Sequence, residues 1–241
     1  MDVFCKIFTL PCELLAKVPG LGPILKSCCT TVGQKILMAL TGLSLCGFLV
    51  AHLGGNLYLF AGQEAFNGYA EKLHSLGPLL WVAEVGLLGL FALHMSLAMS
   101  TAAISLRARG RAYDAKQSKQ EGFVLPNGGA ANLMLGTGLI ILVYLVLHVC
   151  DMKFNVREMG SEENLFELVR NVLCDPKTAA FYVVALLALG VHLTHGVKSA
   201  IQTLGISHPR WNKLFEIGGV LFAWGISLGF LSLVAWAIGA K

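Results

Sequence analysis

Five histidines interrupt the long apolar runs of this sequence, where an imidazole can do chemistry that its neighbours cannot. They are His52, His94, His148, His192 and His195. Ionisable side chains within a membrane are costly, usually face the interior of a helix bundle and mark a functional site. One buried histidine could equally be a hydrogen-bonded core residue, but four separate runs each contain at least one. Neutral imidazoles on facing helices can hold the iron of a haem b, bind a divalent metal or relay protons.

The runs that carry these histidines have the length and composition of membrane spans. The chain of 241 residues is 56% hydrophobic with a mean hydropathy of +0.69, and only 13% of it is charged. Soluble domains carry about 25% charged residues, and a helix crosses the hydrocarbon core with about 20 apolar residues. Five segments qualify: residues 35–60, 78–105, 130–150, 178–203 and 214–238. The sequence therefore predicts an all-α membrane protein with five transmembrane helices in an antiparallel bundle.

Two stretches outside the spans are expected at the membrane surface. The longest loop, residues 151–177, contains the amphipathic stretch NLFELVRNVL. Residues 1–33 form an N-terminal arm, which Asp2 and Glu13 distinguish from a secretory signal. We therefore divide the chain into this arm and a five-helix domain, residues 34–241.

Lysine and arginine predict the orientation of the chain in the membrane. Eleven of them, counting Lys35, lie on the side of the N-terminus, loop 106–126 and loop 204–213, and six lie on the other side. Because cytoplasmic loops carry the excess of these residues, we expect a cytoplasmic N-terminus in the cytoplasmic membrane. The net charge of +4 is too small to suggest a nucleic-acid partner. No C-x-x-C-H stretch is present for covalent attachment of haem.

The depth of each histidine sorts them into two levels. His52 lies 8 residues before the outer end of its run and His148 lies 2 residues before the outer end of its own. His94 lies 16 residues into an inward-running span and His192 lies 14 residues into another, which places both about 20–25 Å from the outer edge. The outer level therefore pairs His52 with His148. The inner level pairs His94 with His192 or His195, because those two differ by only about 4.5 Å along the axis.

Two imidazoles at each of two depths favour a bis-histidine haem b at each level. A divalent-metal or proton pathway would add several carboxylates at the same depth, and only Glu84 lies well inside a span. Small residues on the same helices would make room for the porphyrins, or would serve ordinary helix packing. They are Gly42, Gly47, Gly54, Gly55, Ser96, Ala98, Ser100 and Gly196.

These residues and their surroundings resemble one family, the single-subunit, five-helix, dihaem cytochrome b anchor of succinate dehydrogenase and fumarate reductase. The similarity runs from about Gln34 to the last span. Its marks are AHLGGNLYLFAGQEAFN, LHMSLAMSTAAI, LVYLVLHVCDMKF and LCDPKTAAFYVVALLALGVHLTHGVKSAIQTLGIS. The stretch GQEAFN just after the first span is unusually specific, as is a histidine on the fourth helix followed after three residues by a glycine.

The resemblance implies the ligand set of two haems b. In this family the first and third helices ligate the distal haem, and the second and fourth ligate the proximal haem. Carried over, His52 and His148 hold the distal haem, and His94 and His192 hold the proximal haem. This is the pairing that depth gives, and it selects His192 for the inner level.

Two residues near His192 are then candidates for contacts to that ligand or to a haem propionate. They are His195, almost a turn further along, and Lys198. Lys198, like Arg107, could instead extend to the lipid headgroups.

The resemblance also implies partners and a reaction. Family members dock an iron–sulfur subunit, which holds an FAD-containing flavoprotein where succinate and fumarate interconvert. The proximal haem faces the iron–sulfur subunit, and a quinone, mostly menaquinone in families of this type, reacts near the distal haem. The chain would then carry electrons between that subunit and the quinone.

Quinone reduction consumes protons as well as electrons, so a titratable side chain is expected near the distal haem. Glu71, His74 and Glu84 lie on the correct side, and Asp151 could instead cap or orient the distal site. Each could equally be a solvated charge. Two rival functions remain: a dihaem anchor of a hydrogenase or formate dehydrogenase, and a small transporter that uses its histidines as a proton or metal relay.

Overall fold

The computed structural model describes residues 30–108, 130–161, 164–206 and 208–239, and these are almost entirely helical, with no strand among them. The side chains of residues 105–108 and 130–132 are outside the description. Residues 1–29 of the expected N-terminal arm also lie outside the described residues. The first described helix begins at Thr31, where the side chain of Thr30 accepts a hydrogen bond from the Gly33 N–H at 3.0 Å.

Five helices of the described chain are long and apolar enough to cross a membrane, which confirms the predicted fold class. They are α3 (Thr31–Asn56), α5 (Pro78–Ala108), α6 (Ala130–Met152), α8 (Pro176–Thr203) and α9 (Asn212–Gly239). Large apolar side chains cover their outer faces, and Trp81, Val82 and Leu221 are each at least 67% exposed. Such a surface suits hydrocarbon rather than water.

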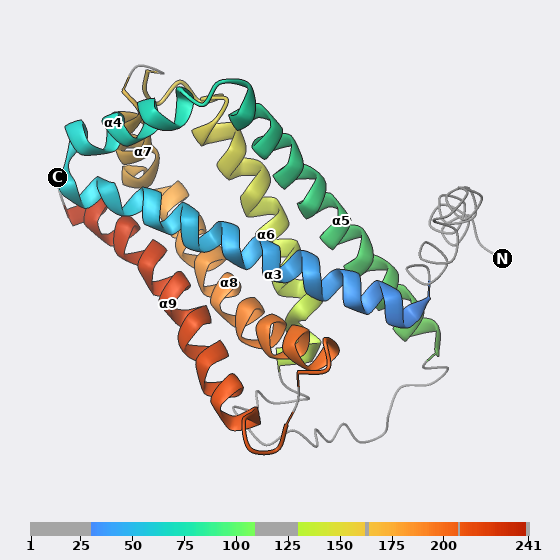
Figure 1. Cartoon of the computed structure of the whole chain (residues 1–241). Coiled ribbons are helices and arrows are strands. Elements are labelled where there is room, and N and C mark those ends of the chain that lie inside the picture. Colours follow the sequence, from blue (N-terminus) through green and yellow to red (C-terminus); the bar gives the residue numbers. More distant parts are fainter. Residues whose placement is uncertain (1–29, 109–129, 162–163, 207, 240–241) are drawn as a thin grey trace.

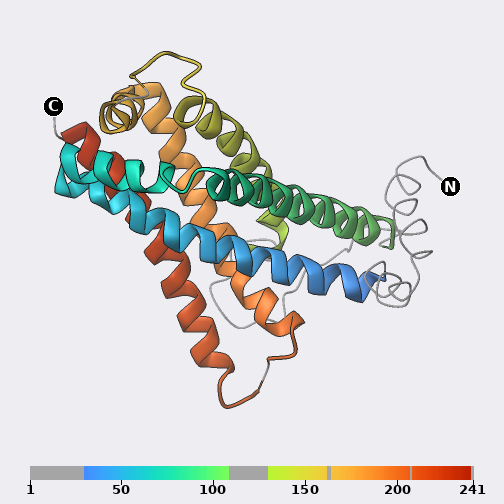
Figure 2. The same ribbon diagram turned by 45° about the horizontal axis from the view of Figure 1, so that its top comes forward.

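The helices pack so that antiparallel neighbours lie side by side. Helix α3 packs against α5, α6 packs against α8, and α8 also contacts α3 and α9. Figures 1 and 2 both show α3 and α5 running in opposite directions next to each other. The short helices α4 (Gln63–His74) and α7 (Leu165–Cys174) gather at one end of the bundle, together with the described end of α9 (Figure 1). We call this the α4/α7 end.

The first span differs from its expected form near the α4/α7 end. Helix α3 stops at Asn56 and continues as a 3-10 helix, η1 (Leu57–Ala61), instead of running to residue 60. The Asn56 Nδ2 donates to the His52 carbonyl at 2.8 Å, and side chains that bond the backbone in this way compete with the α-helical pattern.

Helix α4 was not expected, since the sequence there has turn and polar signals without a strong apolar stripe. Gly62 begins the helix with φ of 97°, a conformation that favours glycine. Phe66 is the buried residue of α4 and packs with Leu59 and Leu233. One anchoring side chain is too little to show as a periodic pattern.

Helix α7 confirms the amphipathic stretch expected in the loop between α6 and α8. Its residues Leu168, Val172 and Leu173 are buried in one cluster with Tyr182 and Leu186 of α8. Immediately after α7, the Asp175 carboxylate caps α8 by accepting from the Thr178 hydroxyl and N–H. These bonds hold the pKa of Asp175 below its usual value.

Candidate functional site

The outer level of histidines forms a facing pair. The ring centres of His52 on α3 and His148 on α6 lie 5.9 Å apart. A metal-bound imidazole nitrogen lies about 2 Å from its ion, so two rings on opposite sides of one ion have centres roughly 6 Å apart. The separation of this pair therefore fits two axial ligands of one haem iron.

Aromatic side chains surround the outer pair. Phe48 stacks on His52 with ring centres 5.1 Å apart, and Tyr144 stacks on His148 at 5.4 Å. Each aromatic residue precedes its histidine by four positions, which places both on one helix face. Phe230 of α9 closes the site beside His52 at 5.7 Å. These apolar rings exclude water from the pair.

The Nδ1 atoms of the outer pair have different partners. His148 Nδ1 lies 3.2 Å from the hydroxyl of Tyr182, a buried residue of α8. His52 Nδ1 lies 3.5 Å from Nδ2 of Asn56 on its own helix. Both Nε2 atoms are left for another ligand, as far as the described residues show.

At the inner level each histidine contacts a threonine of its antiparallel neighbour. His94 Nδ1 on α5 lies 3.1 Å from Thr41 Oγ1 on α3. His192 Nδ1 on α8 lies 3.2 Å from Thr137 Oγ1 on α6. In both rings the same atom, Nδ1, is thus held by a threonine of the neighbouring helix.

A glycine follows each of these threonines and lets the ring approach its neighbour helix. A Cβ atom at Gly42 would lie 3.2 Å from His94 Cε1, and one at Gly138 would lie 3.6 Å from His192 Cε1. Of the other small residues expected to make room, Gly47, Gly54 and Gly196 face open space. Gly55 instead serves packing, since a Cβ there would lie 2.6 Å from the Tyr69 hydroxyl.

His195 and Lys198 lie on the same helix as His192 but have other surroundings. Lys198 Nζ donates to Glu216 Oε1 of α9 at 2.8 Å, so its ammonium already has a carboxylate. His195 is half-buried and makes no hydrogen bond among the residues that the structure describes. Of these two imidazoles, His192 is the one that contacts the neighbouring helix α6, through Thr137. The side chain of Arg107 lies outside the described residues.

The candidates for proton transfer all lie toward the α4/α7 end but do not converge. Glu71 and His74 are exposed on α4. Glu84 of α5 accepts from Lys153 Nζ at 2.6 Å, and that ammonium lies 5.7 Å from the centre of the Trp81 ring. The Glu84 carboxylate is thus part of an ion pair.

Asp151 is the buried charge of this end, with 7% of its side chain exposed. Arg157 donates to its two oxygens at 2.7 and 2.6 Å and to Thr178 Oγ1 at 2.8 Å. The hydrogen bond to Asp151 raises the pKa of Arg157, which therefore stays charged. This network ties the end of α6 to the beginning of α8.

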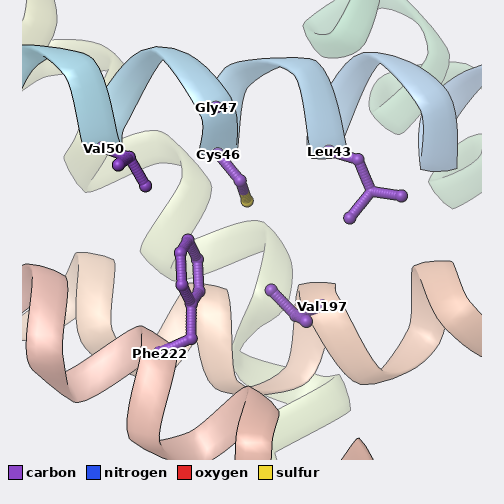
Figure 3. Close-up of a pocket in the computed structure, with 6 residues that line it drawn as sticks. All are labelled: Leu43, Cys46, Gly47, Val50, Val197 and Phe222. Atoms are coloured by element: carbon purple, nitrogen blue, oxygen red, sulfur yellow. The ribbon is translucent and has the colours of Figure 1, made fainter.

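An apolar cavity of about 270 Å³, largely open toward the outside of the bundle, lies between α3, α8 and α9. Figure 3 shows Leu43, Cys46 and Val50 of α3 extending toward Val197 and Phe222. On α3 these residues lie between Thr41 and His52, so the cavity flanks the space between the two levels. Its lining carries no charge and suits the apolar part of a ligand.

Four contacting residues escaped the expectations from sequence: Thr41, Asn56, Thr137 and Tyr182. A signal for the threonines was present as an internal repeat. TGLSLCGFLVAH, residues 41–52, and TGLIILVYLVLH, residues 137–148, are identical at 6 of 12 positions. In both, Thr-Gly comes 11 residues before the outer histidine and an aromatic residue comes 4 residues before it. The repeat pairs α3 with α6 as equivalent helices.

The donor set fits haem b better than a multi-ligand metal site. Among the described residues no group of three or more His, Cys, Asp or Glu side chains could hold a metal ion. His52 and His148 instead form a pair, and a bis-histidine haem b requires two imidazoles.

The chain is 30% identical to the succinate dehydrogenase cytochrome b558 subunit of Bacillus subtilis over 168 residues, which cover 69% of this chain and 77% of that protein. No known family model matches the chain, and no solved structure matches it.

Proposed function

Because the chain belongs to the family of succinate dehydrogenase cytochrome b subunits, the membrane anchors of complex II, we propose that it carries electrons between an iron–sulfur subunit and a membrane quinone. Two haems b would provide the route, one at each level of histidines. The observation that carries this proposal is the 5.9 Å separation of the His52 and His148 rings, which come from different helices.

His52 and His148 would hold the outer haem, and His94 and His192 the inner haem. Held between two imidazoles, a haem b takes up and releases one electron at a time. The chain supplies the four Nε2 atoms, orients each ring through its Nδ1 partner, and surrounds the outer pair with Phe48, Tyr144 and Phe230.

We place the quinone, for which menaquinone is the proposed identity, near the outer level at the α4/α7 end. Glu84 supports this placement, because its ion pair with Lys153 is partly exposed. Once separated from Lys153, the carboxylate would take up a proton and pass it to the quinone. Glu71 and His74 would take up protons at the surface of α4. The iron–sulfur subunit and its flavoprotein would dock at the opposite end, in the cytoplasm with the N-terminus.

The haem content of the purified complex tests the proposal. We expect two haems b per chain from the pyridine haemochrome spectrum, and reduction of both by succinate in a reduced-minus-oxidised spectrum. The absence of a b-type band, or a ratio near one, would contradict it.

The quinone site is tested separately with Glu84→Gln. We expect it to lower the rate of succinate-to-menaquinone-analogue electron transfer while both haems are retained. Lys177→Gln is the matched surface control, since Lys177 lies at the same end without contacting Glu84. Equal rates in the two variants would remove Glu84 from the proton route.

A further inference from the structure

Each inner histidine contacts a threonine hydroxyl that already donates its proton to the backbone of its own helix. Thr41 Oγ1 donates to the carbonyls of Leu37 at 2.9 Å and Met38 at 3.1 Å. Thr137 Oγ1 donates in the same way to Leu133 at 2.8 Å and Met134 at 3.2 Å. A hydroxyl has one proton and two lone pairs. Toward the imidazole, each threonine oxygen can therefore only accept.

The burial of both threonines supports this assignment of donor and acceptor. Thr41 is 5% exposed and Thr137 is 8% exposed, so water does not replace either bond. A hydroxyl that turned its proton toward the ring would leave two oxygen acceptors facing each other in an apolar interior, which is costly. Nδ1 of His94 and of His192 must then carry the proton, and Nε2 of each ring presents its lone pair.

Resting on the proposed function, we propose that Thr41 and Thr137 are positioning residues that fix the inner histidines in the tautomer with a free Nε2 and thereby lower the midpoint potential of the inner haem. A hydrogen bond from Nδ1–H to an acceptor raises the basicity of the ligand nitrogen. A more basic ligand stabilises ferric over ferrous iron. Gly42 belongs to the same arrangement, because a Cβ there would lie 3.2 Å from His94 Cε1, whereas at Gly138 a Cβ would make an ordinary contact of 3.6 Å with His192 Cε1.

The outer level lacks this arrangement. His52 Nδ1 lies 3.5 Å from Asn56 Nδ2, at the limit of a hydrogen bond, and that amide already donates to the His52 carbonyl. It therefore offers no acceptor to the ring and does not fix its tautomer. His148 faces the Tyr182 hydroxyl, which can donate or accept. The chain repeats the Thr-Gly pair on α3 and α6, and both copies serve the inner level.

The test is redox titration of Thr41→Val and Thr137→Val in the purified complex. Valine keeps the shape of threonine and removes the hydroxyl acceptor, while the Met38 and Met134 carbonyls beside the two rings remain. We expect the midpoint potential of the inner haem to rise, by a change on the order of tenfold in the ferrous-to-ferric ratio, which is about 59 mV for one electron. The outer haem, titrated in the same sample, should not move.

Two further variants make the outcome decisive. Thr41→Ser and Thr137→Ser keep the hydroxyl and should restore the potential. Thr101→Val is the matched control, since Thr101 also donates to the carbonyls of its own helix, Leu97 at 2.9 Å and Ala98 at 3.0 Å, and contacts no histidine.

Selective loss of the inner haem in the valine variants, restored by serine, supports the inference in stronger form. No shift beyond that of Thr101→Val, no rescue by serine, or equal effects on both haems would overturn it. A wild-type complex without two haems would instead overturn the proposed function.

Discussion

The two histidine levels use the same residue type on equivalent helices but hold it in different ways. At the inner level, both rings are held across a helix boundary by buried threonine acceptors. At the outer level, one ring is held by its own helix and the other by a tyrosine, and aromatic rings stack on both. The inner level is thus fixed by hydrogen bonds with one defined direction, and the outer level by packing.

This difference has a consequence for how each level responds to its surroundings. An imidazole whose Nδ1–H donates to a fixed acceptor keeps its tautomer and its orientation. The Tyr182 hydroxyl can donate or accept, so the His148 ring beside it can adopt either tautomer. The Asp151–Arg157 network and the Glu84–Lys153 pair lie on the α4/α7 side of the outer level.

Removal of single histidines should separate the levels most strongly. His94→Ala and His192→Ala should each lower the haem content from two to one and remove the same haem, because one imidazole cannot replace a bis-histidine site. His52→Ala and His148→Ala should remove the other. Haem-to-protein ratios with low-temperature spectra measure this.

His195→Ala tests the choice at the inner level, with the loop variant His208→Ala as control. Both should retain two haems. A loss of one haem in His195→Ala, with two kept in His192→Ala, would reverse the assignment of the inner ligand.

Arg157→Ala should destabilise the outer level selectively. It leaves the buried Asp151 carboxylate without its partner. The loss of one partner of a fully buried pair costs about 3–5 kcal/mol, but Arg157 is 40% exposed, so we expect a cost of about 2 kcal/mol. Thermal unfolding followed at the outer haem band should shift down further than the inner band. Lys153→Ala breaks the exposed pair with Glu84 and should cost below about 1 kcal/mol. Equal shifts in the two variants would show that Asp151 does not need its partner.

Substitution of the two glycines should distinguish the halves of the inner level. At Gly42 a new Cβ would lie 3.2 Å from His94 Cε1, so Gly42→Ala should displace the ring and cost about 1–2 kcal/mol. At Gly138 the distance of 3.6 Å is an ordinary contact, and Gly138→Ala should be tolerated. Haem retention during thermal denaturation measures both. The opposite ranking would mean that α6 approaches α8 more closely than α3 approaches α5.

Tyr182→Phe should have a small effect on the outer level. It removes one hydrogen bond to His148 and keeps the packing of the ring, for a loss of about 0.5–1.5 kcal/mol. The midpoint potential of the outer haem should move less than that of the inner haem in Thr41→Val. A larger shift would indicate that Tyr182 acts as a committed acceptor like the threonines.

The sequence by itself determined the five spans and the two depths. Runs of about 20 apolar residues have no stable alternative to crossing the bilayer as helices. Once the helices alternate in direction, residue counts give the depth of each histidine, so the His52–His148 pairing followed from spacing alone. The amphipathic helix α7 was also visible, because several apolar residues recur along one face.

The tertiary structure decided what each side chain faces. Depth could not separate His192 from His195, because the side chains they face depend on the rotation of α8 about its axis. In the structure His192 is the one that contacts Thr137 of α6. The ion pairs of Glu84 with Lys153 and of Lys198 with Glu216 join separate segments, and no local sequence pattern predicts them. Helix α4 depends on the burial of Phe66 against distant residues. Contacts between segments far apart in sequence are set by helix packing, and only the folded chain shows them.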